Sequence, residues 1–150
     1  MNQPARRPSL LQILVHVGGW LPLAVLLAAA LTDNLTANPI QALEQRTGII
    51  ALIFLVLSLA CTPLAMLTGW QELRRRKKAL GLYGFLYAAL HVTIFFAIDY
   101  GLDFAAIWRD VRNKSYILLG ALAFLLLVPL AVTSIKALKR RMGKSWKRLH

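Results

Sequence analysis

Long apolar blocks alternate with short polar segments along the whole chain. The apolar blocks cover residues 10–31, 48–67, 79–98 and 116–135. Each block is close to the roughly 20 residues that an α-helix needs to cross the hydrocarbon core of a bilayer. The pattern predicts an all-α fold: a polytopic transmembrane helical bundle with four spans, forming a single domain over residues 1–150.

The polar segments differ in charge from one side of the predicted membrane to the other. Of the 18 lysines and arginines, 14 lie in the N-terminal arm, in a predicted short loop over residues 68–78 and in the tail 136–150. Residues 32–47 and 99–115 hold five of the six acidic residues. Because positive charge marks the cytoplasmic side, both termini are expected in the cytoplasm and the two acidic loops outside. Within the first acidic loop, residues 40–46 are expected to form a short interfacial helix.

The basic tail carries one apolar stripe. Leu138, Met142, Trp146 and Leu149 follow each other at helical spacing among lysines and arginines. This pattern predicts an amphipathic helix lying on the anionic lipid of the inner leaflet. The entry into a further spanning helix is the alternative interpretation.

Composition excludes several classes of protein. The net charge is +12, but the basic residues flank apolar blocks, which favours membrane topology and lipid over nucleic acid. Cys61 is the single cysteine, so a disulfide framework, a cysteine zinc site and covalently attached haem are excluded, and Cys61 is expected to be a buried apolar residue. The chain has no phosphate-binding glycine loop, HExxH or GxSxG motif, which disfavours hydrolase and nucleotide-driven chemistry.

His91 is the main candidate for chemistry. It lies near the middle of the block 79–98, where an ionisable side chain is costly and indicates a functional site. Gly84 and Ala88 lie close to its helical face and leave space for a flat cofactor. One hypothesis is therefore that His91 is an axial ligand of a b-type haem. The alternative is a close helix-packing face on which His91 bonds to a neighbouring helix.

Three further residues are weaker candidates. His16 lies near the inner end of the first block. It is interpreted as an interfacial histidine near water, and the alternatives are a metal ligand or a hydrogen-bond donor to a cofactor propionate. Lys77 belongs to the basic run 74–78, which is either a topogenic cluster or a site that neutralises haem propionates or a flavin phosphate. His150, considered alone, is a solvated terminal histidine.

Three stretches of the chain resemble one protein family. They are NPIQALEQRTG (38–48), RRKKALGLYGFLYAALHVT (75–93) and MGKSWKRLH (142–150). They are similar to the haem-binding membrane subunit of the bacterial periplasmic protein-methionine-sulfoxide reductase system, within the ferric-reductase-like transmembrane group. The similarity covers nearly the whole chain, in the same order and spacing.

The resemblance implies an electron-transfer subunit of the bacterial inner membrane. Such subunits use b-type haem to pass electrons from the quinone pool or a cytoplasmic flavin reductase to a periplasmic molybdopterin-containing reductase subunit, which repairs oxidised methionines. FMN is a second cofactor associated with the family. By this resemblance His91 is a haem ligand and His150 a second one, the subunit makes no substrate bonds itself, and its partner docks at residues 32–47 and 99–115.

The chain departs from the family in ways that keep other functions open. The family has about six spans of bilayer length, and related reductases place paired histidines about 14 residues, or roughly four turns, apart on one helix. The residue 14 positions before His91 is Lys77, so the partner ligand is expected beyond residue 150 in a longer chain. The alternatives are a ferric reductase of the same group, and a non-redox transporter subunit or assembly factor in which His91 and His16 pack or relay protons.

Overall fold

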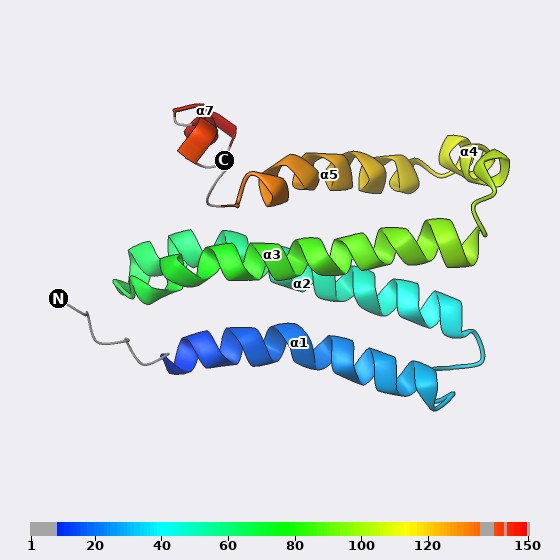
Figure 1. Ribbon diagram of the computed structural model, residues 1–150, viewed down its shortest axis with the longest axis horizontal. Coiled ribbons are helices and arrows are strands. Elements are labelled where there is room, and N and C mark those ends of the chain that lie inside the picture. Colours follow the sequence, from blue (N-terminus) through cyan, green and yellow to red (C-terminus); the bar gives the residue numbers. More distant parts are fainter. Residues whose placement is uncertain (1–8, 136–139, 143, 150) are drawn as a thin grey trace.

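The computed structural model describes residues 9–135, 140–142 and 144–149. These residues confirm the all-α prediction: they contain no strand, and four of their helices are long and apolar enough to cross a membrane. The helices are α1 (Leu10–Leu31), α2 (Pro39–Thr68), α3 (Glu72–Thr93), the π-helix η1 (Ile94–Asp99), α4 (Phe104–Asn113), α5 (Ser115–Val132) and α7 (Lys144–Leu149) (Figure 1).

The four long helices run side by side, and α3 is the central one, packing against α1, α2 and α5. The start of α1, the turn between α2 and α3, and α7 lie together at one end of the bundle, which we call the basic end (Figure 1). The turn at residues 32–38 and the segment 100–114, which contains α4, lie at the opposite end, which we call the loop end.

Helix α2 is longer than the apolar pattern predicts. It begins at Pro39, so the predicted interfacial helix over 40–46 is instead the first part of one continuous helix. Asn38 caps this end, since its side chain accepts a hydrogen bond from the Gln41 N–H at 3.2 Å, and proline is favourable at a first helical position. The helix ends at Thr68, and the next residue, Gly69, has a positive φ of 73°, which suits a glycine cap.

The predicted loops 68–78 and 99–115 are also largely helical. Helix α3 already begins at Glu72, because arginine and lysine are good helix formers that extend their charged ends towards water. In the second loop, the Asp103 carboxylate caps α4 by accepting from the N–H groups of Ala105 and Ala106, both at 3.0 Å. Residues 72–78 and 104–113 were therefore wrongly assigned to loops, since polarity marks the membrane boundary and not the end of a helix.

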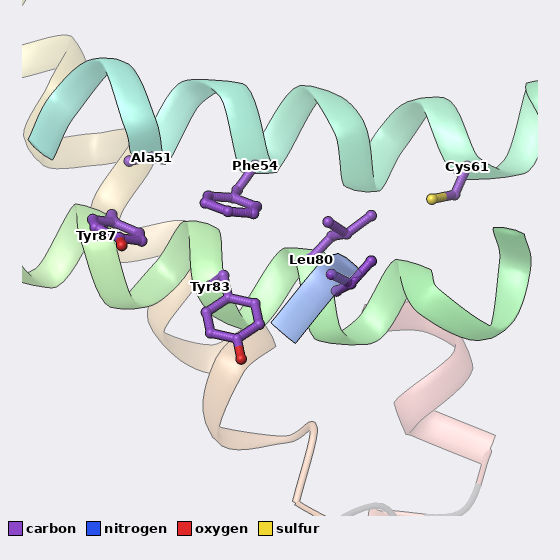
Figure 2. Packing of buried hydrophobic residues seen from close by; sticks show 7 residues of the cluster. Ala51, Phe54, Cys61, Leu80, Tyr83 and Tyr87 are labelled. Atoms are coloured by element: carbon purple, nitrogen blue, oxygen red, sulfur yellow. The ribbon is translucent and has the colours of Figure 1, made fainter. Parts of the chain in front are cut away.

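The core lies between α2 and α3, where aromatic rings interlock (Figure 2). Tyr87 is fully buried, and its ring stacks on that of Phe54 with centroids 5.8 Å apart. Cys61 projects from α2 into the same cluster and is buried, as expected. The Tyr87 hydroxyl donates to the Gly19 carbonyl at 2.7 Å, so this core also holds α1.

Two glycines allow the helices to approach closely. A Cβ atom at Gly84 would lie 2.9 Å from side-chain carbons of Leu55 on α2. A Cβ atom at Gly19 would lie 2.4 Å from the Tyr83 ring. Small residues at helix contacts are typical of membrane bundles, because packing there depends on close backbone approach.

Helix α5 has little contact with the rest of the bundle. None of the residues of α5 is buried. Its main aromatic contact is a stack between the Phe124 ring and the Phe85 ring of α3, with centroids 5.8 Å apart. In the tail, α7 is helical as expected, and the Trp146 indole N–H donates to the Thr133 carbonyl at 3.0 Å. Leu138, at the start of the predicted stripe, lies outside the described residues.

Candidate functional site

The His91 imidazole has a defined hydrogen-bond partner and therefore a defined tautomer. Its Nδ1 lies 3.0 Å from the backbone carbonyl oxygen of Glu44 on α2. Because a carbonyl oxygen only accepts, Nδ1 carries the hydrogen and donates it. In the neutral ring, Nε2 then keeps its lone pair for a metal. Metal-binding histidines usually have this arrangement, in which the second ring nitrogen donates to a carbonyl or carboxylate.

Gly48 provides the space that this ring occupies. A Cβ atom at position 48 would lie 3.3 Å from His91 Nδ1 and 3.4 Å from Cε1, which is tighter than ordinary contact. Gly48 follows Glu44 by one helical turn, so the carbonyl and the glycine lie on the same face of α2. We call Glu44 and Gly48 the His91 seat. Both belong to the stretch NPIQALEQRTG, but nothing in its side-chain pattern identifies a backbone carbonyl as a partner of His91.

Gly84 and Ala88 lie beside the α2–α3 contact. Leu55 fills the space next to Gly84, and Ala88 is half-buried against the core. In this structure Gly84 therefore has the helix-packing role that was the alternative to a cofactor seat. The two interpretations of His91 are compatible, since Nδ1 makes the contact with α2 and Nε2 stays available. That Gly84 and Ala88 border a cofactor remains a prediction.

His16 is paired with Tyr83 and not with His91. Its Nδ1 lies 2.9 Å from the Tyr83 hydroxyl oxygen, and the exposed Trp20 ring meets Tyr83 edge-on at 5.9 Å. Tyr83 precedes His91 by eight residues, about 12 Å along an α-helix, so the two histidines lie at different depths. The pair joins α1 to α3, and this partner was not foreseen from the sequence.

The basic run 74–78 makes contacts with several helices. The Lys77 ammonium donates to the Thr62 hydroxyl at 3.2 Å, and Arg76 forms an ion pair with Glu72 at 3.3 Å. Lys78 donates to a backbone carbonyl just beyond α5. Lys77 and Lys78 thus connect α3 to α2 and to the end of α5, and the role of Lys77 in neutralising a cofactor stays a prediction.

In the described part of the chain, the histidines lie singly and do not form a cluster of metal ligands. Within it, no group of three or more His, Cys, Asp or Glu side chains is placed to hold a metal ion. His150, the second predicted haem ligand, lies outside the described residues. A metal that already has ligands of its own, as in haem, suits a site with one available imidazole nitrogen.

At the loop end, Asp110 forms a polar clamp. Its carboxylate accepts from the Lys114 ammonium at 2.6 Å and from the Tyr100 hydroxyl at 2.5 Å. The bonds from Lys114 and Tyr100 lower the pKa of Asp110. The same bond to Asp110 raises the pKa of Tyr100 to about 12. The clamp fixes α4 to the end of η1.

The Asp110 bonds predict that the stability of the loop end does not change with pH over a range around neutrality. The pKa of Asp110 is lowered on folding, so its stabilising effect is present above the unfolded value of about 3.9 and is lost as pH falls through the lower folded value. Tyr100, with a raised pKa, contributes fully below about 10 and loses its effect as pH rises through about 12. We expect Trp108 emission to be constant between about pH 5 and 9 and to shift in Asp110→Asn at neutral pH. Identical emission in both proteins would contradict the clamp.

The chain is similar to known proteins over most of its length. Residues 47–150 match the family described as ferric reductase like transmembrane component. The chain is 43% identical over 145 residues to the protein-methionine-sulfoxide reductase heme-binding subunit MsrQ of Rhodospirillum rubrum, covering 96% of this chain and 70% of that protein. It is 40% identical over 143 residues to the subunit of the same name from Herminiimonas arsenicoxydans, covering 95% of this chain and 66% of that protein.

The similarity does not extend over the full length of these relatives. A third, from Ralstonia nicotianae, is 40% identical over 141 residues that cover 91% of this chain and 65% of that protein. The chain thus spans about two thirds of the length of the relatives that it matches. No solved structure matches.

Proposed function

Because the chain belongs to the family of ferric reductase like transmembrane components, we propose that it is a haem-binding subunit that carries electrons across a bacterial inner membrane. One observation carries this proposal: the Nδ1–H of His91 donates to the Glu44 carbonyl, which leaves Nε2 as a neutral ligand inside a multi-pass helical bundle. The heme-binding subunits among its relatives support the choice of cofactor.

The residues of the site have distinct tasks. A b-type haem, when bound, supplies a one-electron carrier whose iron alternates between the ferrous and ferric states. His91 would hold the haem iron through Nε2, and a neutral imidazole avoids the cost of a full charge in the membrane. The Glu44 carbonyl keeps the ring in one tautomer, and Gly48 lets the ring lie against α2. His150 is proposed as a second ligand, and Lys77 as a charge partner for a propionate or for FMN.

The proposed direction of electron flow runs from the basic end to the loop end. Most lysines and arginines of the described residues lie at the basic end, and the positive-inside rule supports a cytoplasmic location for it. Quinol or a cytoplasmic flavin reductase is the proposed donor. The proposed acceptor is a periplasmic molybdopterin-containing reductase subunit, because the relatives are named for a methionine-sulfoxide reductase system. This protein itself positions and tunes the cofactor.

Vesicles with the protein in one orientation test the transport of electrons. Reduced flavin and flavin reductase are supplied on the side of the basic end, and ferricyanide, which does not cross membranes, is trapped on the other side. We expect trapped ferricyanide to be bleached in vesicles with the protein and to stay coloured with His91→Ala. Equal bleaching with both proteins would overturn the proposal.

A further inference from the structure

Helix α4 is held at the boundary of the membrane by its connections. Lys114 is the single residue between α4 and α5. Helix α5 has 18 residues, about 27 Å of α-helix, so it needs its full length to cross a hydrocarbon core of about 30 Å. Its first residue, Ser115, must then lie at the membrane surface. Because a single residue spans less than about 4 Å, the C-terminal end of α4 must lie in the headgroup region.

One face of α4 is aromatic and unpartnered among the described residues. Phe104, Trp108 and Arg112 follow each other at intervals of four and share this face. Phe104 is 70% exposed and Trp108 is 59% exposed, whereas Ile107 is buried. Tyr116, at the start of α5, is also largely exposed. Tryptophan and tyrosine are enriched at membrane–water interfaces, because their rings are apolar and their edges are polar.

The charges of the segment fit phosphate groups. The Asp103 carboxylate is used to cap α4, and the Asp110 carboxylate is held by Lys114 and Tyr100. Arg109 and Arg112 stay exposed, and the Arg112 guanidinium lies 5.0 Å from the centre of the Trp108 ring. The two carboxylates therefore have partners within the protein, and the guanidinium groups of Arg109 and Arg112 can contact lipid phosphates.

We infer that α4 is an interfacial anchor, whose face formed by Phe104, Trp108 and Arg112 inserts into the headgroup region of the phospholipid leaflet at the loop end. The occupant of this face is lipid, because the connection to α5 keeps the helix at the depth where phosphates and the first acyl carbons lie. The anchor fixes the depth of α3 and therefore of His91. It also leaves the turn at residues 32–38 as the part of the loop end that is open to a soluble partner. The inference does not rest on the proposed redox function.

Depth-dependent quenching of Trp108 tests the anchor. A protein with Trp108 as its single tryptophan, carrying Trp20→Phe, Trp70→Phe and Trp146→Phe, is reconstituted in phosphatidylcholine–phosphatidylglycerol vesicles. Lipids carry a nitroxide either near the headgroup or near the end of the acyl chain, and fluorescence is normalised to unlabelled vesicles. We expect the shallow label to quench Trp108 more strongly than the deep label, and aqueous iodide to quench it weakly.

A protein with Trp20 as its single tryptophan is the matched control. Trp20 is exposed in the middle of α1, so the deep label should quench it more strongly than the shallow one. In the Trp108 protein, Phe104→Ser should reduce quenching by the shallow label, with Trp20 quenching unchanged in the control protein carrying the same substitution. Strong quenching of Trp108 by iodide without an effect of labelled lipid would overturn the inference in favour of a face open to water. Protection of Trp108 from all three quenchers would overturn it in favour of a protein cover.

Discussion

Replacing His91 with alanine is expected to remove haem from the protein while the helical bundle stays folded. The substitution deletes the proposed Nε2 ligand, and the remaining described histidine, His16, lies at another depth and cannot take its place. The substitution lowers the stability of the bundle only slightly, because His91 is only partly buried and hydrogen bonds between membrane helices contribute on average about 0.6 kcal/mol. Haem per protein, measured by absorbance, and helix content, measured by circular dichroism, check the two parts of this expectation.

Two further measurements separate ligand loss from misfolding. Added imidazole should restore haem to His91→Ala, because a free imidazole can occupy the position of the deleted ring. His16→Ala is the matched control: it breaks the bond to Tyr83 and should keep its haem. Unchanged haem content in His91→Ala would show that the assignment of His91 as a ligand is wrong.

Replacing Gly48 with valine is expected to weaken haem binding although position 48 does not contact the iron. A Cβ atom there already lies 3.3 Å from His91 Nδ1, and the branched side chain of valine adds volume at the same point. The ring must move away from α2 and lose its bond to the Glu44 carbonyl. Loss of such an orienting bond typically lowers metal affinity by about 10- to 100-fold.

The matched control for this substitution is Gly18→Val. A Cβ atom at Gly18 has no neighbouring atom within 4 Å, so the same chemical change in α1 should leave haem binding unaltered. Haem affinity and the midpoint potential of each protein are compared. A shifted potential in Gly48→Val with helix content preserved is the expected result, since a merely structural role of Gly48 would not change the electronic environment of the iron. Equal affinities and potentials in the two variants would contradict the His91 seat.

The fold was largely predictable because a bilayer imposes a strong length requirement on apolar segments. The four long helices follow from the four apolar blocks. Their ends did not follow, because residues 39–47 and 72–78 are polar and helical at once. The π-helix at 94–99 was not foreseen either, since one extra residue in a helical turn leaves no clear pattern of apolar side chains.

The sequence indicates a candidate site only where burying a side chain in the membrane costs free energy. An ionisable residue inside an apolar block singled out His91 without any structure. Its partners were not predictable, because the Glu44 carbonyl is a backbone group that every residue has, and Gly48 is informative only once α2 is known to face His91. The pairing of His16 with Tyr83 likewise depends on which faces of α1 and α3 meet.

The optical difference spectrum of the purified protein tests haem binding at His91 most directly. Protein from haem-replete cells is oxidised in air, reduced with dithionite, and the two absorbance spectra are subtracted. We predict a shift of the Soret band and a sharp α-band for the protein, and the absence of both for His91→Ala. A featureless difference spectrum of the unaltered protein, with its helix content intact, would contradict a haem-based function.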